Sequence, residues 1–110
     1  MRLLVTGATG FVGRHLVPAA LAAGHELSLL LRDHYRSPSA LPAPLDTLAS
    51  HCRPVYADLR NESATCAAVR AAAPEAVLHL AATGVTEPFL PAARAIEHNV
   101  TGTVNLLQAC

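Results

Sequence analysis

The sequence predicts an α/β domain with a doubly wound parallel sheet. Short apolar runs alternate with longer segments whose apolar residues recur at helical spacing. Apolar residues make up 52% of the 110 residues and charged ones 15%, which is typical of a folded chain. Strands that alternate with helices pair in parallel through right-handed crossovers. Because the chain shows no internal repeat, we expect a single unit.

The N-terminal third holds two predicted strands and one helix. Leu3–Val5 is a short buried strand, and Phe11–Ala23 is a helix that Gly24 ends. Glu26–Leu31 is almost entirely apolar, as expected for a strand covered on both faces. We expect Pro18 to kink the helix on its solvent side. The helical face is predicted to consist of Val12, Leu16, Ala19 or Ala20, and Ala23.

The rest of the chain continues the alternation, with proline and small polar residues marking the loops. The third and fourth strands precede helices, and the predicted strand order is 3-2-1-4, with the fourth strand at an edge. The predicted elements are a loop over 33–52 with a short helix at Leu45–Ser50, a strand Pro54–Ala57, a helix from the N-cap Asn61 to Ala73, a strand Ala76–Ala81, a loop Thr83–Pro88 and a helix over 91–109 carrying Ile96, Val100, Val104 and Leu107 at helical spacing.

Composition argues against several classes of function. Eight basic and eight acidic residues cancel, which argues against a nucleic-acid partner, and no apolar run approaches the roughly 20 residues that span a bilayer. Three unpaired cysteines favour a reduced, cytoplasmic protein. None of the six histidines has the spacing of a metal site. We expect His79, in a buried strand, to be a core histidine with satisfied hydrogen bonds.

The strongest signal is the run Thr6-Gly7-Ala8-Thr9-Gly10-Phe11-Val12-Gly13, between a strand and a helix. Gly7 permits a sharp turn, Gly10 lets the backbone approach a pyrophosphate, and Gly13 is expected to let the helix pack against the sheet. The helix then presents free N–H groups to the phosphates. The run therefore predicts a dinucleotide site formed by Gly7, Thr9, Gly10, Phe11, Val12 and Gly13.

This run resembles the TGxxGxxG fingerprint of the short-chain dehydrogenases/reductases. The resemblance is closest to the extended branch, which contains NAD-dependent epimerases and dehydratases of nucleotide sugars. Ala57–Leu59, Pro74–Ala82 and Asn99–Leu107 are similar to three further segments of that family, in the same order. The resemblance implies a Rossmann-type fold and covers the chain, which then corresponds to the N-terminal NAD(P)-binding half-domain, with four strands and their helices.

The resemblance also implies roles for single residues. Asp58, followed by Leu59, would meet the adenine amino group, although it could instead cap a loop. Ala81 and Ala82 would lie beside the cofactor ribose, or be small only for packing. Asn99 would lie near the active site, with a hydrogen-bonded helix residue as the alternative. Gly102 is expected to permit close helix packing.

The end of the second strand bears on the choice between NAD and NADP. An acidic residue commonly grips the ribose 2′-hydroxyl here, but the chain reads Leu31-Arg32-Asp33. Arg32 can bind a 2′-phosphate, and Arg36 or Arg14 could join it. The alternative is that Arg32 is solvated and Asp33 takes the ribose. We favour NADP, with NAD second.

The resemblance implies a catalytic Tyr followed four residues later by Lys, and the 110 residues contain no lysine. We therefore assign no catalytic residue and expect the catalytic and substrate-binding parts to be absent. The leading interpretation is the cofactor-binding portion of an epimerase, dehydratase or reductase acting on a nucleotide sugar or another hydroxyl or carbonyl substrate. A non-catalytic dinucleotide-binding regulator and an inactive truncated product are the alternatives. We expect the parent to form a homodimer, and this chain alone to be inactive and to self-associate.

Overall fold

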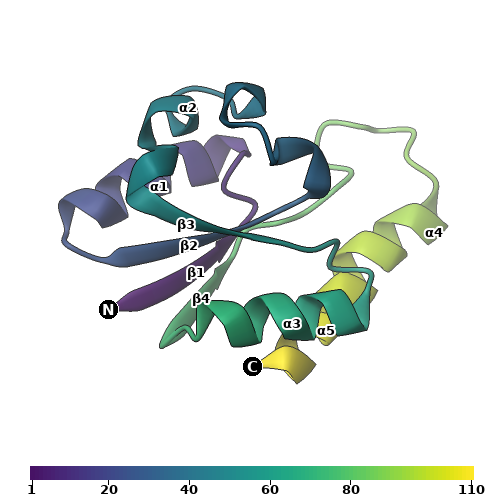
Figure 1. The fold of residues 1–110 in the computed structure, drawn as a ribbon. Helices are drawn as coiled ribbons and strands as arrows, with labels where there is room; N and C mark the ends of the chain where they lie inside the picture. Colours follow the sequence, from purple (N-terminus) through teal and green to yellow (C-terminus); the bar gives the residue numbers. More distant parts are fainter.

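The computed structural model describes residues 1–110, which form a four-stranded parallel sheet with helices on both faces (Figure 1). The strand order is β3-β2-β1-β4, as predicted. One layer holds α1 and α2, and the opposite layer holds α3 and α5 (Figure 1). No helix combines the length and apolar character needed to cross a bilayer. The strands are β1 (Arg2–Thr6), β2 (Glu26–Leu31), β3 (Cys52–Tyr56) and β4 (Ala76–His79); the helices are α1 (Phe11–Ala22), α2 (Leu45–Leu48), α3 (Glu62–Ala72), α4 (Ala92–Ala95) and α5 (Gly102–Ala109).

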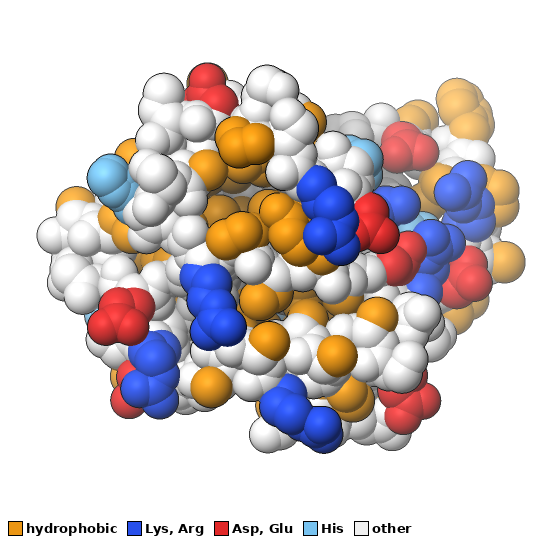
Figure 2. Space-filling model, viewed as in Figure 1, with side chains coloured by type: hydrophobic (Ala, Val, Ile, Leu, Met, Phe, Trp, Pro, Cys, Tyr) orange, Lys and Arg blue, Asp and Glu red, His pale blue; other side chains and the backbone are white.

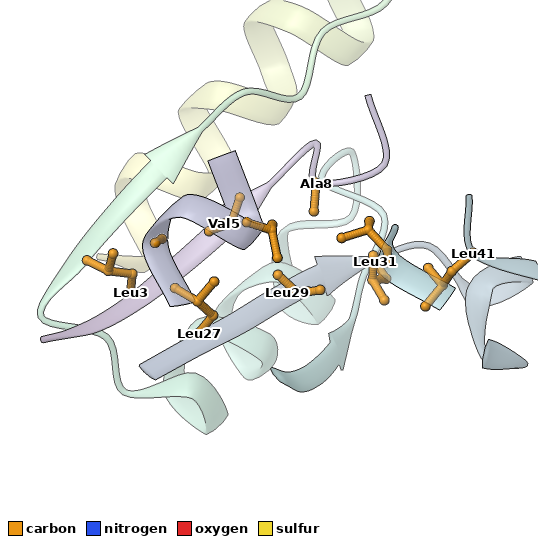
Figure 3. Close-up of a cluster of buried hydrophobic side chains, with 10 residues drawn as sticks. Leu3, Val5, Ala8, Leu27, Leu29, Leu31 and Leu41 are labelled. Carbon is orange, nitrogen blue, oxygen red and sulfur yellow. The ribbon is translucent and has the colours of Figure 1, made fainter. Parts of the chain in front are cut away.

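Two apolar clusters cover the two faces of the sheet. Successive side chains of a strand point to opposite faces, so Leu3 and Val5 of β1 face α1 while Leu4 between them faces α3. Leu27, Leu29 and Leu31 of β2 join the α1 cluster in the same way (Figure 3). Burial on both faces explains why the strands read as continuous apolar runs.

The predicted elements are all present, with shifted ends. The first strand is longer than expected, and the third begins two residues earlier. The fourth ends at His79 rather than Ala81, although Leu80 still donates to the Thr6 carbonyl at 3.1 Å. Gly24 has φ +84° directly after α1, which confirms it as the helix stop. Asn61 accepts the Ala64 N–H at 3.0 Å, which confirms the N-cap of α3.

The predicted inner face of α1 is correct at Ala20 and at Leu16, which packs against the α1 cluster, but wrong at Val12 and Ala23. Gly13, Val17 and Ala20 are buried, whereas Val12 is 58% exposed. Gly13 determines which side of α1 faces inward, because it must contact the preceding glycine loop. The helix is continuous through Pro18.

The C-terminal helical segment is not regular. A π-helical stretch, Ile96–Thr101, separates α4 from α5. Leu106, Asn105 and Gly102 are buried. The apolar residues that mark the segment as a helix instead face outward, with 45–70% of each side chain exposed: Ile96, Val100, Val104 and Leu107. We call these four residues the outer stripe.

Candidate functional site

A cleft of about 410 Å³ opens where β1, β2 and β4 end. The connection after β1 crosses one face of the sheet, and the connection after β3 crosses the other face (Figure 1). The strand order therefore reverses beside β1. Ligands of open α/β sheets bind at such a reversal, at the carboxyl ends of the strands. The predicted site residues that line the cleft are Gly7, Thr9, Gly10, Arg32, Asp58, Leu59, Ala81, Ala82 and Asn99.

Two of the three glycines are required by the fold itself. Gly7 has φ +71°, and a Cβ there would lie 2.5 Å from the Ala81 nitrogen. At Gly13, a Cβ would lie 2.5 Å from Ala8 and also collide with the Gly7 carbonyl oxygen. The expectation that Gly13 packs the helix against the sheet is therefore wrong, because it packs the helix against its own glycine loop.

Gly10 is different, because a side chain there would meet one tight contact rather than a collision with several backbone atoms. Its φ of −76° and ψ of 176° suit any residue, and the nearest atom to a Cβ would be the Gly7 oxygen at 3.3 Å. Gly10 is also the N-cap of α1 and provides no side-chain cap. The first helical bond runs from Arg14 N–H to the Gly10 carbonyl at 3.0 Å, so the preceding N–H groups have no helical acceptor. The loop and helix thus offer free donors and a positive dipole end.

Phe11, Val12 and Gly13 do not line the cleft. Phe11 is 74% exposed. Their side chains therefore form no wall of the site, and only their backbone N–H groups at the helix start can serve it.

Asp58 follows β3 and is held by an ion pair. Both of its carboxylate oxygens accept from Arg60, at 2.6 Å from Nη2 and 3.0 Å from Nε. The hydrogen bonds from Arg60 lower the pKa of Asp58 to about 2, and the charge of Arg32 adds to this effect. Asp58 is therefore a fixed anion at the cleft wall. Oδ1 also accepts the Arg60 backbone N–H at 3.0 Å, so only Oδ2 retains a lone pair for a further donor.

The side chains of Leu31, Arg32 and Asp33, at the end of β2, point in different directions. Leu31 is buried, and Arg32 is exposed on the cleft wall with no hydrogen bond or ion pair. Asp33 lies outside the cleft and binds Arg36 at 2.8 Å, and Arg36 stacks on the Tyr56 ring at 4.2 Å. Neither Arg36 nor Arg14 lines the cleft.

Asn99 clamps the loop that follows β4. Its Oδ1 accepts the Thr83 N–H at 2.8 Å and its Nδ2 donates to the Thr83 carbonyl at 2.9 Å. Asn99 is therefore a hydrogen-bonded helix residue that also lines the cleft. Gly102 sits one turn on, where a Cβ would lie 3.1 Å from Leu59, which confirms its role in close packing.

Sequence reasoning missed several cleft residues. His34 and Tyr35 reach the cleft from a short 3₁₀ turn after β2, and their rings lie 4.0 Å apart. Thr83 and His98 line it beside Asn99. Only position after a strand end could have indicated them. Thr6 was quoted in the glycine motif but not assigned to the site, and it too lines the cleft.

A second hollow, of about 320 Å³, lies between β3 and the segment that carries α2. Figure 2 shows apolar side chains lining this face below α2. Tyr35 borders both hollows. Nowhere do three His, Cys, Asp or Glu side chains gather in a way that could hold a metal ion.

Comparison with known proteins agrees with this geometry. The model of the NAD dependent epimerase/dehydratase family matches residues 3–110. A GDP-6-deoxy-D-mannose reductase of Pseudomonas aeruginosa is 39% identical over 98% of the chain, and a UDP-glucose 4-epimerase of Klebsiella pneumoniae is 31% identical over 99%. The structure of a Thermus thermophilus UDP-glucose 4-epimerase in complex with NAD covers the whole chain with a TM-score of 0.74 and 33% identity.

The chain matches only part of most of these proteins. It covers 29% of the Pseudomonas reductase and 33% of the Thermus epimerase, but 79% of the Klebsiella protein. The match begins at residue 3 and includes the glycine loop, all four strands and the residues of the cleft. The chain therefore belongs to the NAD-dependent epimerase/dehydratase family.

Proposed function

We propose that the cleft binds a nicotinamide dinucleotide, with its pyrophosphate against the glycine loop. The observation that carries this proposal is Gly10. The fold excludes a side chain at Gly7 and Gly13, whereas a Cβ at Gly10 would meet only the Gly7 oxygen, at 3.3 Å, beside free helical N–H groups. Space that faces a positive helix end suits an anionic group that must approach the backbone closely.

The other walls fit the remaining parts of the same ligand. Asp58 is a fixed acceptor for an adenine amino group, and the small side chains of Ala81 and Ala82 leave room over the sheet. Thr83 and Asn99 form the far rim. The bound cofactor would supply a hydride acceptor or donor, while these residues bind and orient it.

A graded series at Gly10 tests the proposal. Gly10→Ala should weaken dinucleotide binding, and Gly10→Val should abolish it, because a branched side chain fills the phosphate position. Since the backbone at Gly10 is extended and a Cβ would press only on the Gly7 oxygen, at 3.3 Å, both variants should lower the melting temperature much less than Gly7→Ala does. Ala19→Val, on the exposed side of the same helix, is the matched control. Unchanged affinity in Gly10→Val, measured by titration calorimetry, would show that the pyrophosphate lies elsewhere.

We propose NADP as the preferred cofactor. Arg32 is free and faces the cleft, Leu31 offers no acceptor to a 2′-hydroxyl, and Asp33 is turned away and paired. A 2′-phosphate would give Arg32 a partner and would bring a counter-charge to an exposed cation. NAD is the alternative, and the Thermus relative was solved with it.

We further propose that the protein containing this chain acts on a nucleotide sugar or another hydroxyl or carbonyl compound, as a reductase, epimerase or dehydratase. The reductase and epimerase relatives support this range. No Tyr with Lys four residues later occurs within the 110 residues, so we assign the proton-transfer step to no residue here. We propose a homodimer that covers the outer stripe, since four exposed apolar side chains on one helical segment favour burial.

A further inference from the structure

A chain of hydrogen bonds runs beneath the floor of the cleft and passes through a histidine that does not line it. His79, the last residue of β4, contacts two hydroxyls. Its Nδ1 lies 2.6 Å from Thr6 Oγ1 and its Nε2 lies 2.9 Å from Thr103 Oγ1. Thr6 ends β1 and Thr103 lies on α5, so the His79 ring links an inner strand of the sheet to a helix of the layer that holds α3 and α5. The contacts beyond these hydroxyls reach Ala81 and Asn99 on the cleft wall.

The direction of each hydrogen bond follows from its neighbours. Thr103 donates its hydroxyl proton to the Asn99 carbonyl at 2.6 Å, so it can only accept from His79. The Thr6 hydroxyl accepts the Ala81 N–H at 3.2 Å and is fully buried, and its proton has no acceptor other than Nδ1 of His79. His79 therefore carries its proton on Nε2 and is neutral. All the donors point the same way, from Ala81 through His79 to Asn99, which strengthens each bond.

We propose that His79 is a positioning residue, held as the neutral Nε2–H tautomer, which fixes the cleft floor relative to the glycine loop. The inference rests on the proposed dinucleotide site. At one end, the Ala81 nitrogen lies where a Cβ on Gly7 would collide with it, so a small movement of the β4 end displaces the glycine turn. At the other end, Asn99 clamps both backbone groups of Thr83 on the cleft rim. His79 thus acts on the ligand only through these residues.

Protonation would break this arrangement at a defined atom. A proton on Nδ1 would face the Thr6 hydroxyl proton, which would lose its acceptor inside the core. The ring nitrogens contact the hydroxyls of Thr6 from β1 and Thr103 from α5, and no charged side chain contributes to the shift in the His79 pKa. Burial accordingly lowers the pKa of His79 from 6.5. Acid should therefore loosen the floor only below the ordinary pKa of a histidine side chain.

Nuclear magnetic resonance of the uniformly labelled protein tests the tautomer and the coupling without any ligand. We expect the ring nitrogens of His79 to report the Nε2–H form at pH 7, with a titration midpoint below the ordinary histidine pKa of 6.5. The amide signals of Ala81 and Thr83 should shift with the same midpoint as His79. An Nδ1–H tautomer, an imidazolium at pH 7, or an Ala81 amide that does not follow His79 would overturn the inference.

Binding measurements then separate this inference from the proposed function. Thr103→Val removes the acceptor for His79 and the donor to Asn99 outside the cleft, and should weaken NADP(H) binding roughly three- to tenfold. Thr103→Ser keeps the hydroxyl and should restore the affinity, which a purely steric role would not predict. If the wild type binds and Thr103→Val binds equally well, the positioning role is wrong and the dinucleotide site stands. If the wild type binds no dinucleotide, the proposed function fails, while the tautomer experiment still decides the state of His79.

Discussion

Arg32→Ala tests the proposed preference for NADP. The Arg32 side chain makes no hydrogen bond or ion pair, so its removal leaves no buried group unpaired and takes away only a charge that helps to lower the pKa of Asp58. We therefore expect the free energy of unfolding to change by less than about 0.5 kcal/mol. Binding of a 2′-phosphate should suffer instead, because the substitution removes the free guanidinium on that wall of the cleft.

The expected magnitude follows from the exposure of the side chain. A hydrogen bond to a charged partner contributes about 1.5–3 kcal/mol, and solvent screening places an exposed pair at the lower end or below. About 1.4 kcal/mol corresponds to tenfold in affinity. Arg32→Ala should therefore weaken NADP(H) roughly tenfold, and NAD(H) by less than about twofold. Titration calorimetry with both cofactors at one fixed salt concentration measures the ratio.

Arg36→Ala is the matched control, since it removes the same charge four residues after Arg32. Its guanidinium is bound to Asp33 and stacked on Tyr56, outside the cleft. It should leave the cofactor ratio unchanged. Equal losses of NAD(H) and NADP(H) affinity in Arg32→Ala, or a wild type that prefers NAD(H), would refute the assignment.

Three further predictions concern the glycine turns, the ion pair of Asp58 and the outer stripe. Gly7→Ala should lower the free energy of unfolding by at least about 2 kcal/mol, and Gly24→Ala by about 1 kcal/mol. Both glycines have positive φ, but only at Gly7 would the new Cβ also collide with the backbone of Ala81. Urea unfolding of the two variants measures the difference. The pKa of Asp58 is lowered from 3.8 to about 2, so the contribution of its charge to stability is complete above pH 4 and is lost as the pH falls toward 2. Arg60→Met should reduce the loss of unfolding free energy between pH 6 and pH 3, measured from unfolding curves at both pH values. An unchanged loss would exclude the ion pair as its cause. Val100→Asp should shift the protein to a smaller species in size-exclusion chromatography with light scattering, and an unchanged mass would exclude the outer stripe as the dimer surface.

The strands and the glycine loop could be predicted because their signals are local. Apolar runs bounded by Gly7 or by proline identify the strands, and the glycine spacing identifies the turn between β1 and α1. Arg32 could likewise be placed on the cleft, because it directly follows a strand whose end faces the ligand. In each case the residue and the structural feature lie within a few positions of each other.

Contacts between distant segments could not be predicted. The pairing of His79 with Thr103 and of Asn99 with Thr83 depends on how α5 packs across the sheet, for which the sequence has no local signal. The inner face of α1 was wrong at Val12 and Ala23, because alanines on both sides of the helix make the apolar stripe ambiguous. The residues of the outer stripe have the spacing of an ordinary buried helix face, although they are exposed in the structure.

The central claim is that the glycine loop holds the pyrophosphate of a dinucleotide. The most direct test is a titration of NADP⁺ into ¹⁵N-labelled protein, followed through the backbone amide signals. The account predicts saturable shifts that are largest at Phe11, Val12 and Gly13, where the free N–H groups of α1 lie, with smaller shifts at Ala81. An absence of saturable shifts, or shifts confined to the second hollow between α2 and β3, would contradict it.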